Sequence, residues 1–343
     1  MEIEMATLIK TGTLITASET YQAYILIEGE KISAIGKDLT APPQAQVIDA
    51  SGRLVMPGGV DVHTHLELPM FGTVSSDDHY TGMKAAAFGG TTTVIDFISQ
   101  DVSPLLKNVE LWHAKADEKA AVDFGFHMNI TRFDAEVAKD IPLLVKQGIT
   151  SIKVFTAYNN RLRLQDGELF QVLRIARENG ILVMAHCENG DVIDILVREA
   201  LEQGHTSPEW HALTRPAWGE VESINRVISL AGQAGASVYI VHMTTAGGVD
   251  RVRHARDKSL PVMGETCPPY LFFTIEDLKR KDGAKWICSP PLRTEADNRG
   301  LWRGLKNGSL QTIGTDHCPF FYDGSQPILY EGKPVAIPGK ELG

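Results

Sequence analysis

The spacing of hydrophobic residues changes near residue 55 and predicts a different kind of structure on each side of that point. Before it, short runs in which apolar and polar residues alternate are separated by Thr-Gly, Glu-Gly-Glu and Gly-Lys turns. Alternation with turns at intervals of about 8–12 residues is typical of a small all-β module. We expect residues 1–55 to form this module, with strands at 7–9, 13–16, 23–27, 31–35, 47–50 and 54–55.

After residue 55, short apolar runs alternate with longer amphipathic stretches, which is the α/β pattern of βα units. Three of the longer stretches, 134–147, 168–179 and 220–234, are followed by Gly148, Gly180 and Gly235, residues that helix C-termini favour. Eight such units predict a TIM-type (β/α)8 barrel over residues 56–343, whereas the alternative, a doubly wound open sheet, does not need eight. The expected strands are 55–65, 92–97, 123–130, 151–157, 181–187, 237–243, 261–266 and 312–317.

Composition narrows the class of protein. A chain of 343 residues accommodates a barrel of roughly 250 residues and an appendage. The 33 Lys+Arg and 43 Asp+Glu residues give a net charge of −10, which disfavours nucleic acid and anionic membranes as partners. No apolar run reaches the roughly 18 residues of a membrane span, and the N-terminus lacks the pattern of a signal peptide. The four cysteines include no C-x-x-C pair, which argues against a zinc knuckle or a thioredoxin motif, and they are too few for a disulfide scaffold. From these observations together we expect a cytoplasmic enzyme.

Histidines and an aspartate stand where the expected strands end, which is where barrel enzymes carry their functional side chains. The first strand ends with His63 and His65, whose i, i+2 spacing directs both side chains to one face. Taken alone, this pair has an alternative interpretation as two hydrogen-bonded structural histidines. The fifth and sixth strands end at His186 and His242, and the eighth ends at Asp316. Four imidazoles and a carboxylate exceed the needs of one zinc ion, so the pattern indicates two adjacent metals.

Two metals need a bridging ligand, and the fourth strand offers a lysine for it. Lys153 lies within the apolar run Ser151-Ile152-Lys153-Val154-Phe155. Burial beside two dications disfavours the ammonium form, and the neutral amine can add CO2 to become a carbamate, which is a carboxylate in its ligand chemistry. The alternative is a lysine at the strand margin that extends to solvent.

An ordered series of segments then matches a known family. They are PGGVDVHTHLELP, FGGTTTVIDF, GITSIKVFTAY, AHCENGDVI, ALTRP, VHMTTAGGV, GETCPPYL, SPPLR and GTDHCPF. Through them, from about residue 5 to its end, the chain resembles the dihydropyrimidinase/hydantoinase group of cyclic amidohydrolases in the amidohydrolase superfamily. The resemblance also implies a small β-sandwich domain to which residues 1–55 contribute.

The resemblance implies a binuclear centre, usually of zinc, with a carboxylated lysine. One metal would take His63, His65, Lys153 and Asp316, and the other Lys153, His186 and His242. Tyr158 matches the family tyrosine that contacts the substrate carbonyl, and Ser289 the serine whose backbone contacts the cyclic amide. A homotetramer or dimer is implied as well.

The implied reaction is the hydrolytic opening of a dihydropyrimidine or 5-substituted hydantoin to an N-carbamoyl amino acid by a metal-bridging hydroxide. Tyr158 would donate a hydrogen bond to the developing oxyanion, and Asp316 would carry the proton to the leaving ring nitrogen. Residues 66–75 and 155–164 are the candidate loops that select the ring substituent.

Two alternatives belong to other branches of the superfamily. Dihydroorotases and allantoinases typically follow H-x-H with an Arg or Asn, whereas Leu66-Glu67-Leu68-Pro69 follows here. The collapsin response mediator proteins are assembly proteins that have lost metal ligands, whereas this chain keeps all of them.

Other histidines receive structural interpretations, and the chain is shorter than the family pattern. We expect core or outer positions for His127 and His317, and surface positions for His79 and His211. Family members continue beyond the eighth strand with an Ile-Pro-Asn-Gly segment and returning β-strands. We expect this chain, which shows neither, to lack the C-terminal part of the family pattern, truncated after strand eight.

Overall fold

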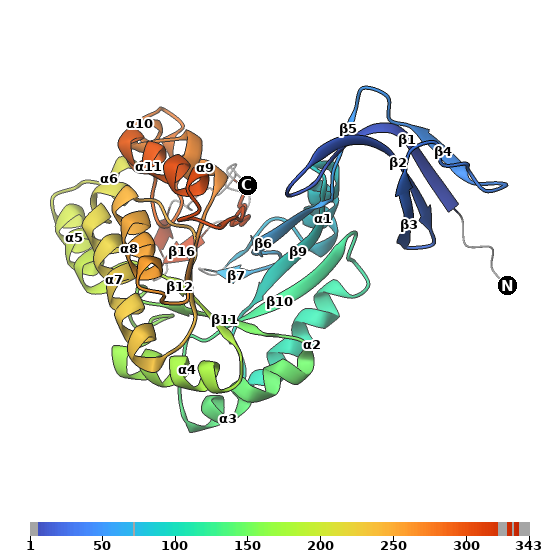
Figure 1. Ribbon diagram of the computed structural model, residues 1–343. Helices are drawn as coiled ribbons and strands as arrows, with labels where there is room; N and C mark the ends of the chain where they lie inside the picture. The colour runs from blue at the N-terminus through green and yellow to red at the C-terminus, as the bar shows by residue number, and fades with distance from the viewer. Residues whose placement is uncertain (1–5, 71–72, 322–327, 331–332, 336–343) are drawn as a thin grey trace. The chain divides into compact units, whose positions relative to one another are not determined.

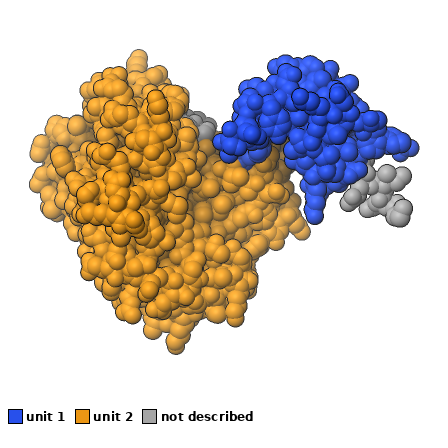
Figure 2. Space-filling model, viewed as in Figure 1, with its two compact units in different colours: residues 1–59 blue, residues 60–343 orange. Residues whose placement is uncertain are grey.

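The computed structural model describes residues 6–70, 73–321, 328–330 and 333–335. It divides into two compact units, residues 1–59 and residues 60–343 (Figure 2), a few residues later than the predicted boundary at 55. No helix in the described ranges is long and apolar enough to cross a lipid bilayer.

The N-terminal unit is a mixed sheet, as the alternating pattern predicts. Its strands are β1 (Ala6–Ile15), β2 (Thr20–Glu28), β3 (Lys31–Gly36), β4 (Gln46–Asp49) and β5 (Leu54–Val55), in the order β3-β2-β1-β4 with β5 also on β1. The runs predicted as separate strands at 7–9 and 13–16 are one strand, β1, interrupted by a register shift between Ile9 and Gly12. Thr11 adopts a positive φ of 59° at this bulge, which explains why the alternation breaks there.

The second unit contains the predicted barrel (Figure 1). Its eight-stranded sheet runs in the order β15-β14-β13-β12-β11-β10-β9-β6, the reverse of chain order. A parallel bridge between Thr64 and His317, with the His65 amide donating to the His317 carbonyl at 2.8 Å, joins the two edges. The strands are β6 (Gly59–Thr64), β9 (Thr91–Ile98), β10 (Asp123–Asn129), β11 (Ser151–Phe155), β12 (Leu182–His186), β13 (Val238–Ile240), β14 (Val262–Thr266) and β15 (Thr312–Ile313).

Helices follow the strands and pack around the barrel as neighbours, with α7 against both α4 and α8, and α8 against α11. The predicted stretches correspond to α3, α4 and α7, and Gly148, Gly180 and Gly235 adopt the positive φ of a helix C-terminus. The helices are α1 (His79–Phe88), α2 (Leu105–Ala116), α3 (Ala135–Leu144), α4 (Asp166–Glu178), α5 (Gly190–Glu202), α6 (Glu209–Leu213), α7 (Ala217–Ala234), α8 (Ala246–Asp257), α9 (Pro268–Phe272), α10 (Ile275–Leu278) and α11 (Glu295–Lys306). The described elements also include two short 3-10 helices, η1 (Val145–Gln147) and η2 (Gly283–Trp286). There are two two-stranded ribbons as well, β7 (Pro69–Met70) with β8 (Thr73–Val74) and β16 (Ile328–Tyr330) with β17 (Lys333–Val335).

The main core fills the layer between the strands and the helices. Outward-facing residues of the strands, such as Ile152 and Val183, contact helix residues such as Leu173 and Ile224, and all of them are buried. Strands β11 and β12 are buried along nearly their whole length, which is typical of parallel strands that helices cover. This rigid layer holds the strand ends, and therefore the side chains on them, in fixed positions.

Candidate metal centre

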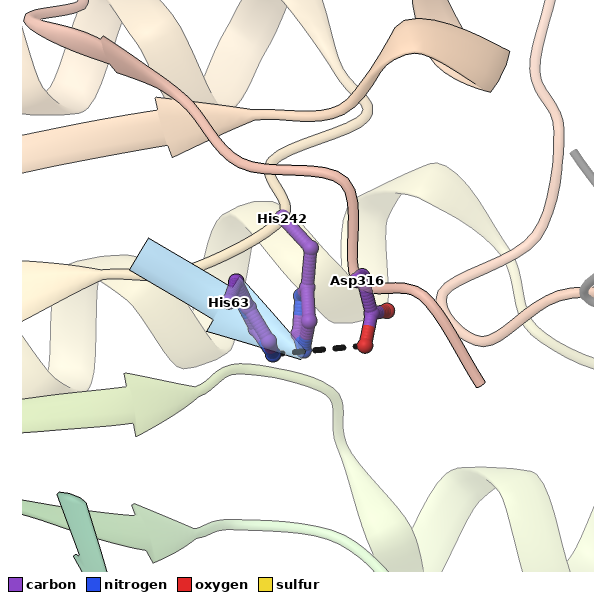
Figure 3. Close-up of side chains that lie close together, drawn as sticks. All are labelled: His63, His242 and Asp316. Atoms are coloured by element: carbon purple, nitrogen blue, oxygen red, sulfur yellow. Dashed lines mark ion pairs between the residues drawn. The ribbon is translucent and has the colours of Figure 1, made fainter. Parts of the chain in front are cut away.

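The barrel brings together the side chains that the strand-end pattern singled out. His63 lies near the end of β6, His186 is the last residue of β12, and His242 and Asp316 follow β13 and β15 closely. Ligand atoms of His63, His242 and Asp316 all lie within 4.8 Å of one another (Figure 3). Oδ1 of Asp316 is 3.2 Å from Nε2 of His63 and 3.2 Å from Nε2 of His65. These groups therefore converge on one point at the carboxyl end of the barrel.

The remaining candidates extend this cluster on its other side. Nδ1 of His186 lies 3.0 Å from Nε2 of His242, and Nζ of Lys153 lies 2.9 Å from Nε2 of His63. Lys153 is 2% exposed, so the alternative in which it extends to solvent is wrong. Nζ also lies 4.3 Å from the ring centroid of Phe97, which closes the apolar side of the amine.

The donor set fits divalent metal ions. Imidazole nitrogens and carboxylate oxygens are the ligands that zinc and similar ions bind in proteins, and the histidines must be neutral to serve. Burial, followed by the positive charges nearby, holds the pKa of His242 well below its usual value, so its imidazole is neutral. His242 and Asp316 both adopt a positive φ, at 39° and 53°, in the region that residues other than glycine rarely occupy. Local strain of this kind is found where the surrounding structure fixes functional groups.

A second layer of buried carboxylates orients the histidines, and its most important member was missed from the sequence. Glu265 lies on β14 with no exposed surface, and its Oε1 lies 2.7 Å from Nδ1 of His63 and accepts the His242 amide at 3.0 Å. Its Oε2 accepts the Tyr239 hydroxyl at 2.8 Å. Burial raises the pKa of Glu265 to about 7. A carboxylate at the end of the apolar run 261–266 was the signal that could have identified it.

His186 has its own carboxylate partner. Oε2 of Glu188 lies 2.9 Å from Nε2 of His186, which leaves Nδ1 of that imidazole directed at His242. Burial by itself raises the pKa of Glu188, but the His186 hydrogen bond and nearby positive charges lower it to about 2. Glu188 is therefore a charged group held beside a candidate ligand, as metal-binding histidines commonly require.

Two histidines predicted to lie at the surface are buried or half-buried, and that expectation was wrong. His79 has no exposed surface because, as the first residue of α1, it faces inward, with Nδ1 3.2 Å from Glu67 and Nε2 3.5 Å from Asp96. Burial alone lowers the pKa of His79, but these two carboxylates raise it. His211 is half-buried, with Nε2 3.0 Å from Oγ of Ser289, and burial lowers its pKa to about 3.

The structural interpretations of His127 and His317 agree with their contacts. His127 is buried against the hydroxyl of Ser151 and the carbonyl of Val62, and burial lowers its pKa to about 4. Nε2 of His317 lies 2.8 Å from Oδ2 of Asp77.

A cavity of about 410 Å³ opens above the cluster. Tyr158 and Ser289 line it, with the Tyr158 ring centroid 5.1 Å from that of His186. Leu68 and Met70 from the first predicted loop, and Phe155, Arg161 and Leu162 from the second, also line it. Residues 71–72 of the first loop lie outside the described ranges. The candidate substrate contacts and most of the candidate metal ligands therefore line the same cavity.

Comparison with known proteins gives consistent matches. Residues 54–336 match the model of the amidohydrolase family. The chain is 47% identical over 328 residues to a D-hydantoinase of Geobacillus stearothermophilus, covering 94% of this chain and 69% of that protein. It is 44% identical over 345 residues to a D-hydantoinase of Streptomyces coelicolor, covering 98% of this chain and 74% of that one. The crystal structure of a dihydropyrimidinase from Brevibacillus agri superposes with a TM-score of 0.92 at 48% identity, covering 94% of this chain and 70% of that chain.

Proposed function

The chain belongs to the amidohydrolase family, and from that premise we propose that it opens a cyclic amide ring by hydrolysis. Its substrate class is the dihydropyrimidines or 5-substituted hydantoins, and the product is an N-carbamoyl amino acid. The observation that carries the proposal is the convergence of four histidines, an aspartate and a buried lysine at the base of one cavity. The relatives named D-hydantoinase and dihydropyrimidinase support this class over the allantoinase, dihydroorotase and non-catalytic alternatives.

The centre would hold two divalent metal ions, which we propose to be zinc. His63, His65, Lys153 and Asp316 would hold one ion, and Lys153, His186 and His242 the other. When bound, the ions lower the pKa of a shared water and polarise the substrate carbonyl.

Lys153 is the proposed bridge, as an N6-carboxylysine. Its amine lies among imidazoles, away from solvent, at 2.9 Å from Nε2 of His63. An ammonium group in that position would repel both metal ions, whereas a carbamate supplies two oxygens and a negative charge. The bond formed is between Nζ and the carbon of CO2, and the amine releases one proton.

The protein's own groups orient the substrate and move the proton. The Tyr158 hydroxyl would donate a hydrogen bond to the carbonyl oxygen as negative charge develops on it. The Asp316 carboxylate would accept the proton of the attacking water and return it to the leaving ring nitrogen. The backbone of Ser289 would hold the cyclic amide. Nε2 of His211 lies 3.0 Å from Oγ of Ser289 and orients that side chain.

Hydrolysis of a substrate panel with metal analysis tests the proposal. We expect ring opening of dihydrouracil or of a 5-substituted hydantoin, lost on chelation and restored by a divalent ion. Protein that holds metal but opens no ring in the panel, or that opens rings without metal, contradicts the proposal.

The Lys153→Ala variant tests the bridging role separately. It should lose both metal and activity, and short carboxylic acids should restore part of the activity by occupying the place of the carbamate. Full activity of Lys153→Ala without added acid removes Lys153 from the centre. A Lys115→Ala variant is the control, because Lys115 is a half-buried lysine of α2 outside the cavity lining.

We also propose a cytoplasmic location and a homotetramer or dimer. The four cysteines are all buried and include no C-x-x-C pair, and four in 343 residues are too few for a disulfide scaffold, which supports a reducing compartment. Size-exclusion chromatography with light scattering tests the assembly, and a monomer at micromolar concentration contradicts it.

A further inference from the structure

A cluster of polar and charged side chains holds the segment that carries Tyr158. It consists of Asn159, Arg163, Asp191 and Asp194, and we refer to it as the Tyr158 clamp. Nη1 of Arg163 donates to Oδ1 of Asp191 at 2.5 Å and to Oδ1 of Asn159 at 2.8 Å. Nδ2 of Asn159 donates to Asp191 at 3.0 Å and to Asp194 at 2.8 Å. The clamp thus ties the turn after β11 to the first turns of α5.

The backbone that the clamp holds is unfavourable on its own. Tyr158 has a φ of 65° and Asn160 a φ of 59°. A residue other than glycine rarely adopts this region and persists there only where its surroundings hold it. The Tyr158 carbonyl accepts the amides of Arg161 at 3.1 Å and Leu162 at 3.0 Å, so the strained residue sits at the start of a tight turn.

Helix α5 also presses directly against this turn. A Cβ at Gly190, the first residue of α5, would lie 2.7 Å from Oδ1 of Asn159 and 2.9 Å from Cα of Ala157. Only a glycine leaves room for the turn to lie this close to the helix. The clamp bonds and the glycine contact therefore fix the turn through residues that are not part of the cavity lining.

We propose that the Tyr158 clamp is a positioning device, which sets the place of the Tyr158 hydroxyl relative to the metal ligands. The proposal rests on the proposed function, in which that hydroxyl stabilises the oxyanion. The Tyr158 ring lies 5.1 Å from the His186 ring, so a shift of the turn changes the distance from the hydroxyl to the reacting carbonyl. None of the four clamp residues is a candidate metal ligand, and they act through Tyr158.

The charges of the clamp make this role separable from folding. The Arg163 side chain is 10% exposed, whereas that of Asp191 is 67% exposed. Exposed ion pairs contribute little to folding stability. Removal of the exposed Asp191 carboxylate takes two of the four clamp bonds and leaves no cavity in the barrel core, so we expect the turn to loosen while the barrel stays folded.

The test is a double-mutant cycle between Asp191→Ala and Tyr158→Phe, followed by steady-state hydrolysis of dihydrouracil or a hydantoin. We expect Asp191→Ala to lower kcat about tenfold with metal content and KM unchanged, because small misplacements of an oxyanion donor are costly in rate. In the Tyr158→Phe background the same change should lower kcat less than about twofold, since the positioned hydroxyl is already absent. Asp191→Asn keeps a hydrogen-bond acceptor without the charge, and its kcat should lie between those of wild type and Asp191→Ala.

Asp250→Ala is the matched control. Asp250 is a helical aspartate with the same 67% side-chain exposure, and it pairs with Arg253 at 2.9 Å far from the cavity lining. It should leave kcat unchanged. A loss from Asp191→Ala that is equal in both backgrounds, or no greater than the loss from Asp250→Ala, overturns the clamp.

The result separates the clamp from the proposed function. Wild-type kcat in Tyr158→Phe contradicts the proposed role of Tyr158 itself. If the wild-type protein opens no cyclic amide, the proposed function fails, and 19F NMR of protein labelled with 3-fluorotyrosine still tests the clamp. The Tyr158 resonance, assigned by its absence in Tyr158→Phe, should shift in Asp191→Ala and stay in place in Asp250→Ala. An unchanged resonance in Asp191→Ala contradicts the clamp.

Discussion

Glu265 is expected to control metal affinity although it is not itself a candidate ligand. Its Oε1 lies 2.7 Å from Nδ1 of His63 and accepts the His242 amide, so one carboxylate orients two ligands from different strands. The test is Glu265→Gln, which keeps the shape of the side chain and removes its charge. The measurement is made at pH 8, because the Glu265 pKa is raised by burial to about 7 and the carboxylate is then ionised.

The expected magnitude follows from the hydrogen bonds. A bond to a charged group contributes roughly 1.5–3 kcal/mol, against roughly 0.5–1.5 kcal/mol for a neutral one. Glu265→Gln replaces the charged bond to His63 with a neutral one, a loss of about 1–1.5 kcal/mol. Since about 1.4 kcal/mol corresponds to a tenfold change, metal affinity should fall about tenfold. Glu265→Ala leaves buried groups of His63, His242 and Tyr239 without their acceptor, and its affinity should fall about 100-fold.

The assay is titration of metal-free protein against a competing chelator, with circular dichroism to show that each variant is folded. Tyr239→Phe is the control, because the Tyr239 hydroxyl donates to Glu265 at 2.8 Å and Tyr239 is not itself a candidate ligand. It should change the affinity less than about threefold. Folded Glu265→Gln protein that binds metal as tightly as wild type would refute the reasoning. An effect of Tyr239→Phe as large as that of Glu265→Gln would refute it equally.

The other predictions concern stability. The His79 pKa is raised by Asp96 and Glu67, so its contribution to stability is fully present below the unfolded pKa of about 6.5 and is lost as pH rises through the raised value. The loss in Tm on His79→Gln should accordingly be larger at pH 6 than at pH 9, and an equal loss at both contradicts the assignment. Gly300→Ala should destabilise by about 1–3 kcal/mol in urea unfolding, because its Cβ would lie 2.9 Å from the Ala246 backbone where α8 and α11 meet. Gly167→Ala should stabilise the protein by about 0.5–1 kcal/mol, because a Cβ at Gly167 would have no neighbour within 4 Å. If both variants change the free energy of unfolding in the same direction, the packing described for these two glycines is contradicted.

The barrel was predictable, and so was the meeting of the candidate ligands at one end of it, because both depend on local periodicity. Strand length, helix amphipathicity and glycine C-caps are properties of a few neighbouring residues, and they predicted all eight strands of the barrel sheet. In a closed parallel sheet the carboxyl ends of the strands meet, so residues at strand ends, such as His63 and Asp316, come together even when they are far apart in sequence. The resemblance then supplied the proposed role of Tyr158 and the proposed pairing of candidate ligands with metals.

The sequence did not predict contacts between residues that are far apart along the chain and that no local pattern connects. Glu265 on β14 meets His63 on β6 because the two edges of the sheet join, and only the closed ring decides that this carboxylate, rather than another, orients that imidazole. The residues around His79 are typical of a surface helix, yet the His79 side chain is buried beside the carboxylates of Asp96 and Glu67.

The sequence by itself determined the fold class and the donor chemistry, because hydrophobic periodicity and ligand type depend only on which residues stand at which spacing. The tertiary structure alone decided what surrounds those donors, including the carboxylates behind the histidines and the clamp of Arg163 and Asp191 behind Tyr158. Those contacts depend on side-chain distances of about 3 Å between separate elements. Such distances follow from the packing of the whole barrel and from no segment of the chain alone.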